Sequence, residues 1–262
     1  ILGVERGERL NTFLTVAKIF PLVLLVAGGL LAIDPANLEV TTAPAKIAYR
    51  ETIRGPGKGV GRHVKQTGGH GQYAVCTIEV EPLPRGEGFE YVDKIFGGAI
   101  PHQFIGSVEK GIVKTMQQGV ISGNPMVDIR CTLVDGKFHS VDSSDMAFQL
   151  AGSLALKEAA AAAGVVLLEP IVEVDVVVPE SHTGDIMGDL NAKRAKIQGV
   201  ESAGAGKQRV KALVPQAEVA RYSIDLRSMT GGRAAFTMHF SHYEEVPSHL
   251  ADKIIAATQQ AK

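Results

Sequence analysis

Residues 65–73, with the sequence KQTGGHGQY, have the composition of a segment that meets a polyanion. Glycines at positions 68, 69 and 71 let the backbone take positive φ and approach another surface closely. The residues that precede it, Arg50, Glu51, Arg54, Lys58, Arg62 and Lys65, carry five positive charges against one negative charge. A cationic, glycine-rich segment before an apolar strand suits contact with a phosphate backbone, although spacing alone does not identify the polyanion.

A second group, His139, Asp142, Ser143 and Ser144, contains the residue types of a serine hydrolase. Such an enzyme needs its nucleophile on a strained turn and its three groups from separate elements. Here the serines stand directly before a long run rich in Ala and Leu, where they suit a helix N-cap. We therefore predict a helix start at this point and no catalytic residue.

Other candidate sites are weaker. Residues 55–59 contain a Gly-Lys pair, but Gly59 stands where a nucleotide-binding P-loop needs Ser or Thr. His239 and His242 are three residues apart on a predicted strand and point to opposite faces, which disfavours a shared metal ion. Cys76 and Cys131 lie in separate apolar runs without metal-ligand spacing, so we expect buried, reduced thiols. These patterns predict no metal and no cofactor bound by this chain itself.

The composition is typical of a folded, soluble protein with about two domains. The chain has 262 residues, of which 45% are hydrophobic and 21% charged. Its formal net charge of −1 excludes a uniformly basic nucleic-acid-binding surface, so local patches would have to supply any such contact.

Residues 13–33 are almost all apolar, and their length would fit a membrane span. Pro21 and the Gly28-Gly29 pair would interrupt a helix, and the preceding charges alternate in sign instead of forming a basic signal-peptide region. We interpret residues 1–43 as strand and helix pieces of upstream domains, joined across missing sequence. The alternatives are a buried hairpin and a membrane segment, which would make the chain a tethered binding domain.

From residue 44 the hydrophobic periodicity predicts a regular series of elements. We expect a strand over 45–53, a loop or irregular hairpin over 54–72, a strand over 73–81, a helix over 104–118, a strand over 126–134 ending in the turn signal Asp135-Gly136, and a helix over 146–163. Gly164 supplies the stop of the last helix. Its alanines 159–163 are expected only to favour helix formation.

Glu169-Pro170 is predicted to mark a boundary between this part and the rest of the chain. Beyond it we expect a strand over 171–178, a helix over 183–194, strands over 195–202 and 207–214 joined by the Gly204-Ala205-Gly206 turn, a helix over 215–227, a strand over 233–243 and a terminal helix over 248–261. The order strand, helix, strand, strand, helix, strand is typical of a ferredoxin-like split βαβ domain.

Six ordered blocks resemble the C-terminal part of elongation factor G, over about residues 45–247. They are AYRETI (48–53), KQTGGHGQY (65–73), FGGAIP (96–101), HSVDSS (139–144), GDIMGDL (184–190) and LRSMTGGRA (226–234). The resemblance implies an α+β fold class with three parts. These are remnants of domains II and III at 1–43, an S5-like α/β domain IV at 44–167, and a ferredoxin-like domain V with a C-terminal helix at 168–262.

The resemblance also implies that the KQTGGHGQY loop and the turn bearing His139 lie together at the tip of domain IV. There they would contact ribosomal RNA of the decoding region and the tRNA–mRNA pair. The expected contact residues are Lys65, Gln66, Thr67, Gly68, Gly69, His70, Gly71, Gln72 and His139. Lysine and histidine can meet phosphate, glutamine can hydrogen-bond either way, and His139 can also donate to a 2′-OH.

The function implied by the resemblance is that of a ribosome-contacting arm of a translational GTPase, in a cytoplasmic monomer that promotes tRNA and mRNA translocation. GTP and Mg²⁺ would bind to an upstream domain, so this chain alone should have no activity. His70 stands where the family usually has Arg, Ser140 where it usually has Asp, and residues 216–225 also differ. These departures fit equally a diverged paralogue that acts in ribosome recycling or protection, which is the alternative function.

Overall fold

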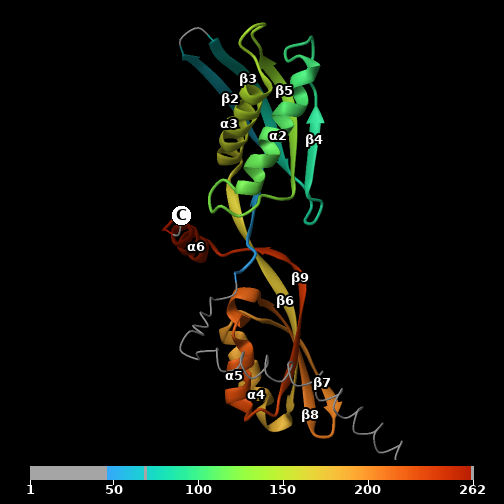
Figure 1. Ribbon diagram of the computed structural model, residues 1–262. Coiled ribbons are helices and arrows are strands. Elements are labelled where there is room, and N and C mark those ends of the chain that lie inside the picture. The colour runs from blue at the N-terminus through green and yellow to red at the C-terminus, as the bar shows by residue number, and fades with distance from the viewer. Residues whose placement is uncertain (1–45, 68–69, 261–262) are drawn as a thin grey trace, which may run out of the picture. The chain divides into compact units, whose positions relative to one another are not determined.

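The computed structural model describes residues 46–67 and 70–260 (Figure 1). Our interpretations of residues 1–43, including the apolar run 13–33, lie outside the described residues, as do the positions of Gly68 and Gly69. None of the helices in the described part of the chain combines the length and the hydropathy of a membrane span.

The first sheet unit, residues 57–163, is a sheet with two helices packed on one face (Figure 1). Its strands are β2 (Gly57–Thr67), β3 (His70–Pro82), β4 (Phe89–Asp93) and β5 (Ile129–Lys137), and its helices are α2 (His102–Gln118) and α3 (Asp145–Ala163). The strand order is β2-β3-β5-β4; β2, β3 and β5 are antiparallel, and β4 is parallel to β5.

Both helices agree with the sequence prediction. Val108, Ile112 and Met116 of α2 are buried in the core, as their spacing indicated. Helix α3 begins after Ser144, whose hydroxyl accepts a hydrogen bond from the Ala147 N–H at 3.3 Å.

The basic stretch 54–72, predicted as a loop or irregular hairpin, is instead mostly the regular strand β2. Every second residue of this strand faces α3, and at 57, 59 and 61 that residue is glycine. A Cβ atom on Gly59 would lie 2.2 Å from the Ala155 carbonyl oxygen, so only glycine permits this approach. The hairpin alternative was right, but the hairpin is regular, because these glycines serve close helix–strand packing and not a loop.

The Asp135-Gly136 pair is likewise not a turn. Both residues lie in β5, beside the register shift between Thr77 and Ile78 of β3. A Cβ on Gly136 would lie 2.4 Å from Cδ1 of Ile100, so this glycine also permits a close contact. The short strand β4 was not predicted.

The second sheet unit, residues 165–245, has the predicted split βαβ order. Its elements are β6 (Val165–Pro179), η2 (Glu180–His182), α4 (Thr183–Ala192), β7 (Lys196–Gly204), β8 (Lys207–Pro215), η3 (Gln216–Val219), α5 (Tyr222–Thr230) and β9 (Ala235–Glu245), followed by α6 (Ser248–Gln260). Strand β6 pairs antiparallel with both β8 and β9. Valines of β6 and β8 form a core with Ile186 and Leu190 of α4 and Leu226 of α5.

Three element boundaries differ from the sequence prediction by five residues or more. Glu169 and Pro170 do not end a strand, because β6 continues through them. The part of β6 before Glu169 pairs with β1 (Arg50–Ile53), and Glu169 and Pro170 themselves pair with β9. The strand expected over 45–53 is correspondingly short. The helix expected from residue 215 begins only at Tyr222, since the 3₁₀ turn η3 follows Pro215.

Candidate nucleic-acid interface

The segments around the β2–β3 turn and between β5 and α3 meet at one end of the first sheet unit (Figure 1). The Tyr73 N–H donates to the Asp142 carbonyl oxygen at 2.9 Å. The Ser143 hydroxyl donates to the Tyr73 carbonyl oxygen at 2.7 Å. These bonds join segments about 70 residues apart in the sequence, and we call the joined segments, residues 65–67, 70–73 and 137–144, the tip.

Asp142 is the residue that ties the two loops together. Its Oδ1 accepts a hydrogen bond from the Gly71 N–H at 3.1 Å. A Cβ on Gly71 would lie 2.7 Å from the Asp142 Cγ atom, so the contact requires glycine at position 71. Gly71 was predicted to allow contact with an external surface, and in the structure it also allows this internal contact.

His139 is exposed at the tip and its ring is held by the backbone. Nδ1 of His139 lies 3.2 Å from the Asp142 N–H nitrogen, which donates to it, and 3.3 Å from Oδ2 of Asp142. The Tyr73 ring lies beside it, with ring centroids 6.3 Å apart. When Nδ1 accepts from the Asp142 N–H, the proton of the neutral ring is on Nε2, where it can donate to a phosphate or hydroxyl oxygen.

Ser143 and Ser144 have structural hydrogen bonds. The Ser143 hydroxyl accepts from the His139 N–H at 2.9 Å while donating to Tyr73, and Ser144 caps α3. A hydroxyl that donates to a backbone carbonyl is not activated by a histidine base. The arrangement of these serines is that of a capped loop.

The cations of the upstream stretch differ in their partners. Lys58 pairs with Glu79 at 3.0 Å, and Arg54 pairs with Glu245. Among the described residues, Arg62 and Lys65 have no acidic group within 4.0 Å. Two of the three cations of this stretch without an acidic partner in the described chain, Arg62 and Lys65, therefore lie toward the tip end of β2, and the third, Arg50, lies in β1.

Glu51, counted as the one opposing charge of this stretch, does not face the cations. It is fully buried, and its carboxylate accepts hydrogen bonds from the N–H groups of Val120 and Ser122 at 2.6 and 2.7 Å. The local positive excess is thus not reduced by Glu51 at the surface.

Gln72 is partly engaged within the sheet. Its Oε1 lies 2.8 Å from Nε2 of His63, one strand away. Its amide NH₂ group remains as a donor. Of the other predicted contact residues, Gln66, Thr67 and His70 lie in the hairpin strands, and Gly68 and Gly69 lie outside the described residues.

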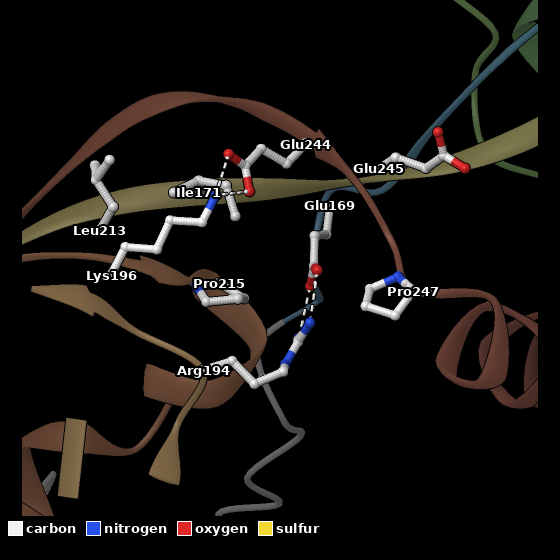
Figure 2. A pocket seen from close by; sticks show the side chains of 9 residues that line it. All are labelled: Glu169, Ile171, Arg194, Lys196, Leu213, Pro215, Glu244, Glu245 and Pro247. Carbon is white, nitrogen blue, oxygen red and sulfur yellow. Dashed lines mark hydrogen bonds and ion pairs between the residues drawn. The ribbon is translucent and has the colours of Figure 1, made fainter. Parts of the chain in front are cut away.

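A pocket of about 210 Å³ lies in the second sheet unit, and none of the residues that line it belongs to the tip (Figure 2). Its charged groups are already paired: Arg194 donates to both oxygens of Glu169 at 2.8 Å, and Lys196 donates to Glu244 at 2.8 Å. The hydrogen bonds that Arg194 donates to Glu169, and then to Glu218, raise the pKa of Arg194 above its ordinary value. The pairs connect β6 to the residues before β7, and β7 to β9, so we assign the pocket a structural role.

The cysteines and histidines that were considered as ligands do not form a metal cluster. Across residues 46–67 and 70–260, no group of three His, Cys, Asp or Glu side chains is arranged to hold a metal ion. Cys76 and Cys131 are buried free thiols, and burial raises the pKa of each to about 12. The prediction that both thiols are buried is confirmed.

The fold defines an α+β protein in which an S5-like α/β unit precedes a ferredoxin-like unit, and the tip adds an exposed, cationic pair of loops. The family model described as "Elongation factor G, domain IV" matches residues 45–164, and that described as "Elongation factor G C-terminus" matches residues 166–254. The chain therefore belongs to the elongation factor G family.

Relatives support this assignment. The chain is 56% identical over 220 residues to an "Elongation factor G-like protein" of Mycobacterium tuberculosis (strain CDC 1551 / Oshkosh), covering 84% of this chain and 31% of that protein. It is 54% identical over 226 residues to "Elongation factor G" of Aquifex pyrophilus, covering 86% and 32%. A crystal structure of a Thermus thermophilus protein superposes with a TM-score of 0.73 at 42% identity, covering 83% of this chain and 32% of the other. The chain thus spans about a third of the length of these relatives.

Proposed function

We propose that this chain is the ribosome-contacting arm of a translational GTPase, and that its tip follows the tRNA–mRNA pair in the decoding region during translocation. The observation that carries the proposal is the joining of the two tip loops by Asp142 and Tyr73, with unpaired cations beside them. Two linked loops on the end of a sheet form a firm support that could block the return of a displaced tRNA.

The side chains at the tip supply contacts of different kinds. Arg62 and Lys65 supply positive charge for phosphates. His139 supplies an Nε2–H donor, and Gln72 supplies its amide NH₂.

The domain assignments 44–167 and 168–262 remain part of this proposal. Strand β6 continues across the boundary between them.

GTP and Mg²⁺ would be bound by a domain of the whole protein outside this chain. Within the described residues, the Gly-Lys pair at 57–59 does not form a phosphate loop, because Gly57 and Gly59 pack against α3. We propose that the whole protein is a cytoplasmic monomer, and that this arm transmits the effect of GTP hydrolysis without performing it.

The test uses the full-length protein with Lys65→Ala, Gln72→Ala and His139→Ala, singly and combined. We expect the combined variant to slow single-turnover translocation about tenfold or more, since each lost hydrogen bond to a charged group costs ~1.5–3 kcal/mol. Lys58→Ala is the matched control, because Lys58 lies on the same strand but is paired with Glu79. Unchanged translocation by the combined variant would remove the tip from the mechanism.

A second candidate is a paralogous ribosome-binding factor that acts in recycling or protection. The favouring observation is that the relatives from Mycobacterium tuberculosis, at 56% and 55% identity, carry the name "Elongation factor G-like protein". Multiple-round translocation measured beside ribosome-stimulated GTP hydrolysis separates the two functions. Hydrolysis without translocation would support the second candidate and contradict the first.

A further inference from the structure

The loop between β4 and α2, residues 94–101, presents an aromatic side chain that nothing in the described part of the chain covers. Phe96 is 93% exposed, more than the other exposed large hydrophobic residues in residues 46–67 and 70–260. Gly97 and Gly98 follow it with φ values of 66° and 75°, and a Cβ on either would meet no atom of the described chain within 4 Å. The backbone therefore turns directly after Phe96 and leaves both faces of its ring open.

This loop is anchored on both sides of the turn. The Lys94 N–H donates to the Leu133 carbonyl oxygen at 2.9 Å, and the Ile95 N–H donates to Oδ1 of Asp93 at 2.9 Å. On the other side, Ile100 is buried against Gly136 of β5. An exposed aromatic ring on an anchored loop loses little conformational entropy when it is covered.

The loop lies at the same end of the first sheet unit as the tip (Figure 1). Gly136, which contacts Ile100, is followed in the chain by the tip residues Lys137, Phe138 and His139. The start of α2 is also joined to the start of α3, because the Ser107 hydroxyl donates to Asp145 at 2.5 Å. The β4–α2 loop is therefore a third loop beside the two that form the tip.

The charges at this end indicate the chemistry of the partner. Among the described residues, Lys65, Lys94 and Lys137 have no acidic group within 4.0 Å. The carboxylates of this end instead accept internal hydrogen bonds: Asp93 from Ile95, Asp142 from Gly71 and Asp145 from Ser107. The lysines, and not these carboxylates, are therefore the charged groups of this end that are left without a partner among the described residues.

Free cations beside exposed aromatic rings suit a partner that is both anionic and flat. Unpaired nucleotides have this combination, because the phosphate carries charge and the base stacks on an aromatic ring. A protein partner would instead favour a contiguous apolar groove, whereas Phe96 is followed by two glycines and, among the described residues, forms no ring pair with another aromatic side chain. We propose that Phe96 stacks on an unpaired base of the RNA that the tip contacts, an inference that rests on the proposed function.

The first test measures binding of the full-length protein to two fluorescently labelled RNA hairpins, one with four unpaired adenosines in its loop and one with four abasic nucleotides there. We expect the adenosine loop to bind about tenfold more tightly, which corresponds to about 1.4 kcal/mol, because only this loop offers bases that can stack on Phe96. Phe96→Ala should remove this preference and leave abasic binding unchanged, while Phe96→Trp should keep it. Lys94→Ala with Lys137→Ala should weaken both hairpins alike.

Phe240→Ala is the matched control, since Phe240 is exposed on β9 in the second sheet unit. Equal binding of both hairpins by the wild type, or an unchanged preference in Phe96→Ala, would overturn the inference. If the Lys65 and His139 variants still slowed translocation in that case, the proposed function would stand and only the role of Phe96 would fall.

A photo-crosslinking phenylalanine analogue at position 96 tests the same point on the ribosome. The expected product is a crosslink between the full-length protein and RNA that is lost on ribonuclease treatment. A crosslink to ribosomal protein alone would mean that Phe96 docks on protein and would overturn the inference, as would no crosslink at all.

Discussion

The two sheet units pack their helices by different means. In the first unit, glycines of β2 face alanines of α3, and the backbones approach until a Cβ on Gly61 would lie 1.8 Å from the Ala151 carbonyl oxygen. In the second unit, valines of β6 and β8 pack against Ile186 and Leu190. Its glycines at 184, 188 and 199 have no neighbour within 4 Å of their Cβ positions in the described chain.

The difference teaches that glycine has different structural consequences in the two units. In the first unit, glycine is the contact surface, and alanine spacing of four along α3 places small side chains opposite it. In the second unit, the contact surface is aliphatic and the glycines are solvent-facing or in turns. The unit that carries the tip is therefore the less tolerant of added volume.

The largest expected effect is that of Gly61→Ala. The new methyl group would overlap backbone atoms of α3, which cannot move as a flexible side chain does, so we expect a loss of about 3 kcal/mol in the free energy of unfolding. Urea unfolding of the whole chain measures it. Gly199→Ala in β7 is the matched control in the second unit and should change stability by less than about 1 kcal/mol; equal effects of both would contradict the comparison.

Helix α2 offers a second control for the same point. Gly111 faces α3, where a Cβ would lie 2.0 Å from the Gln149 carbonyl oxygen, whereas Gly106 faces open space. Gly106→Ala should stabilise the helix by up to about 1 kcal/mol, since alanine has the higher helix propensity. Gly111→Ala should destabilise it despite the same gain in propensity.

The buried glutamates extend the comparison. Glu51 is satisfied by backbone N–H groups of the segment after α2, whereas Glu169 in the second unit is satisfied by the Arg194 guanidinium. Glu51→Ala would leave those N–H groups buried without an acceptor, which we expect to cost about 3 kcal/mol in unfolding free energy. Glu79→Ala, which removes an exposed partner of Lys58, should cost less than about 1 kcal/mol. A similar loss in both variants would mean that water reaches the backbone groups around Glu51.

The smallest expected effect is a pH-dependent one in the second unit. Glu244 accepts a hydrogen bond from Lys196, and this bond is the main cause that lowers the pKa of Glu244 below the ordinary 4.5. The stabilisation is therefore present above about pH 4.5 and is lost as the pH falls through the lowered pKa of the folded state. Lys196→Met should reduce stability by at most about 1 kcal/mol at pH 7, because the pair is exposed, and the difference should vanish in acid. A difference that persists below the lowered pKa would assign the effect to packing of the lysine chain.

Much of the fold could be predicted because its signals are local. Ser144, Gly164 and the intervening alanines and leucines defined α3, and the strand–helix order after residue 165 defined the ferredoxin-like unit. The errors came from residues whose roles are set by distant partners. Gly57, Gly59 and Gly61 were interpreted as loop residues because their neighbour, α3, lies about 90 residues later in the chain.

The candidate site, like the fold, could be predicted from the sequence only where its signals are local. The sequence indicated a cationic, glycine-containing segment and a histidine on a separate turn, and the coordinates place these segments together through Tyr73 and Asp142. It gave no sign that Asp142 joins them, because a carboxylate near a helix start is already explained by capping. Phe96 was also missed as a candidate, since exposure of a single apolar residue is not visible in a linear pattern.

The sequence alone determined the elements, their order and the excess of positive charge before residue 65, because helix caps, periodicity and charge depend on residues close in the chain. Only the tertiary structure decided which cations remain unpaired, which glycines are contact surfaces and which loops share one end of the sheet. Those properties depend on contacts between residues far apart in the sequence, such as Gly61 with Ala151 and Gly71 with Asp142.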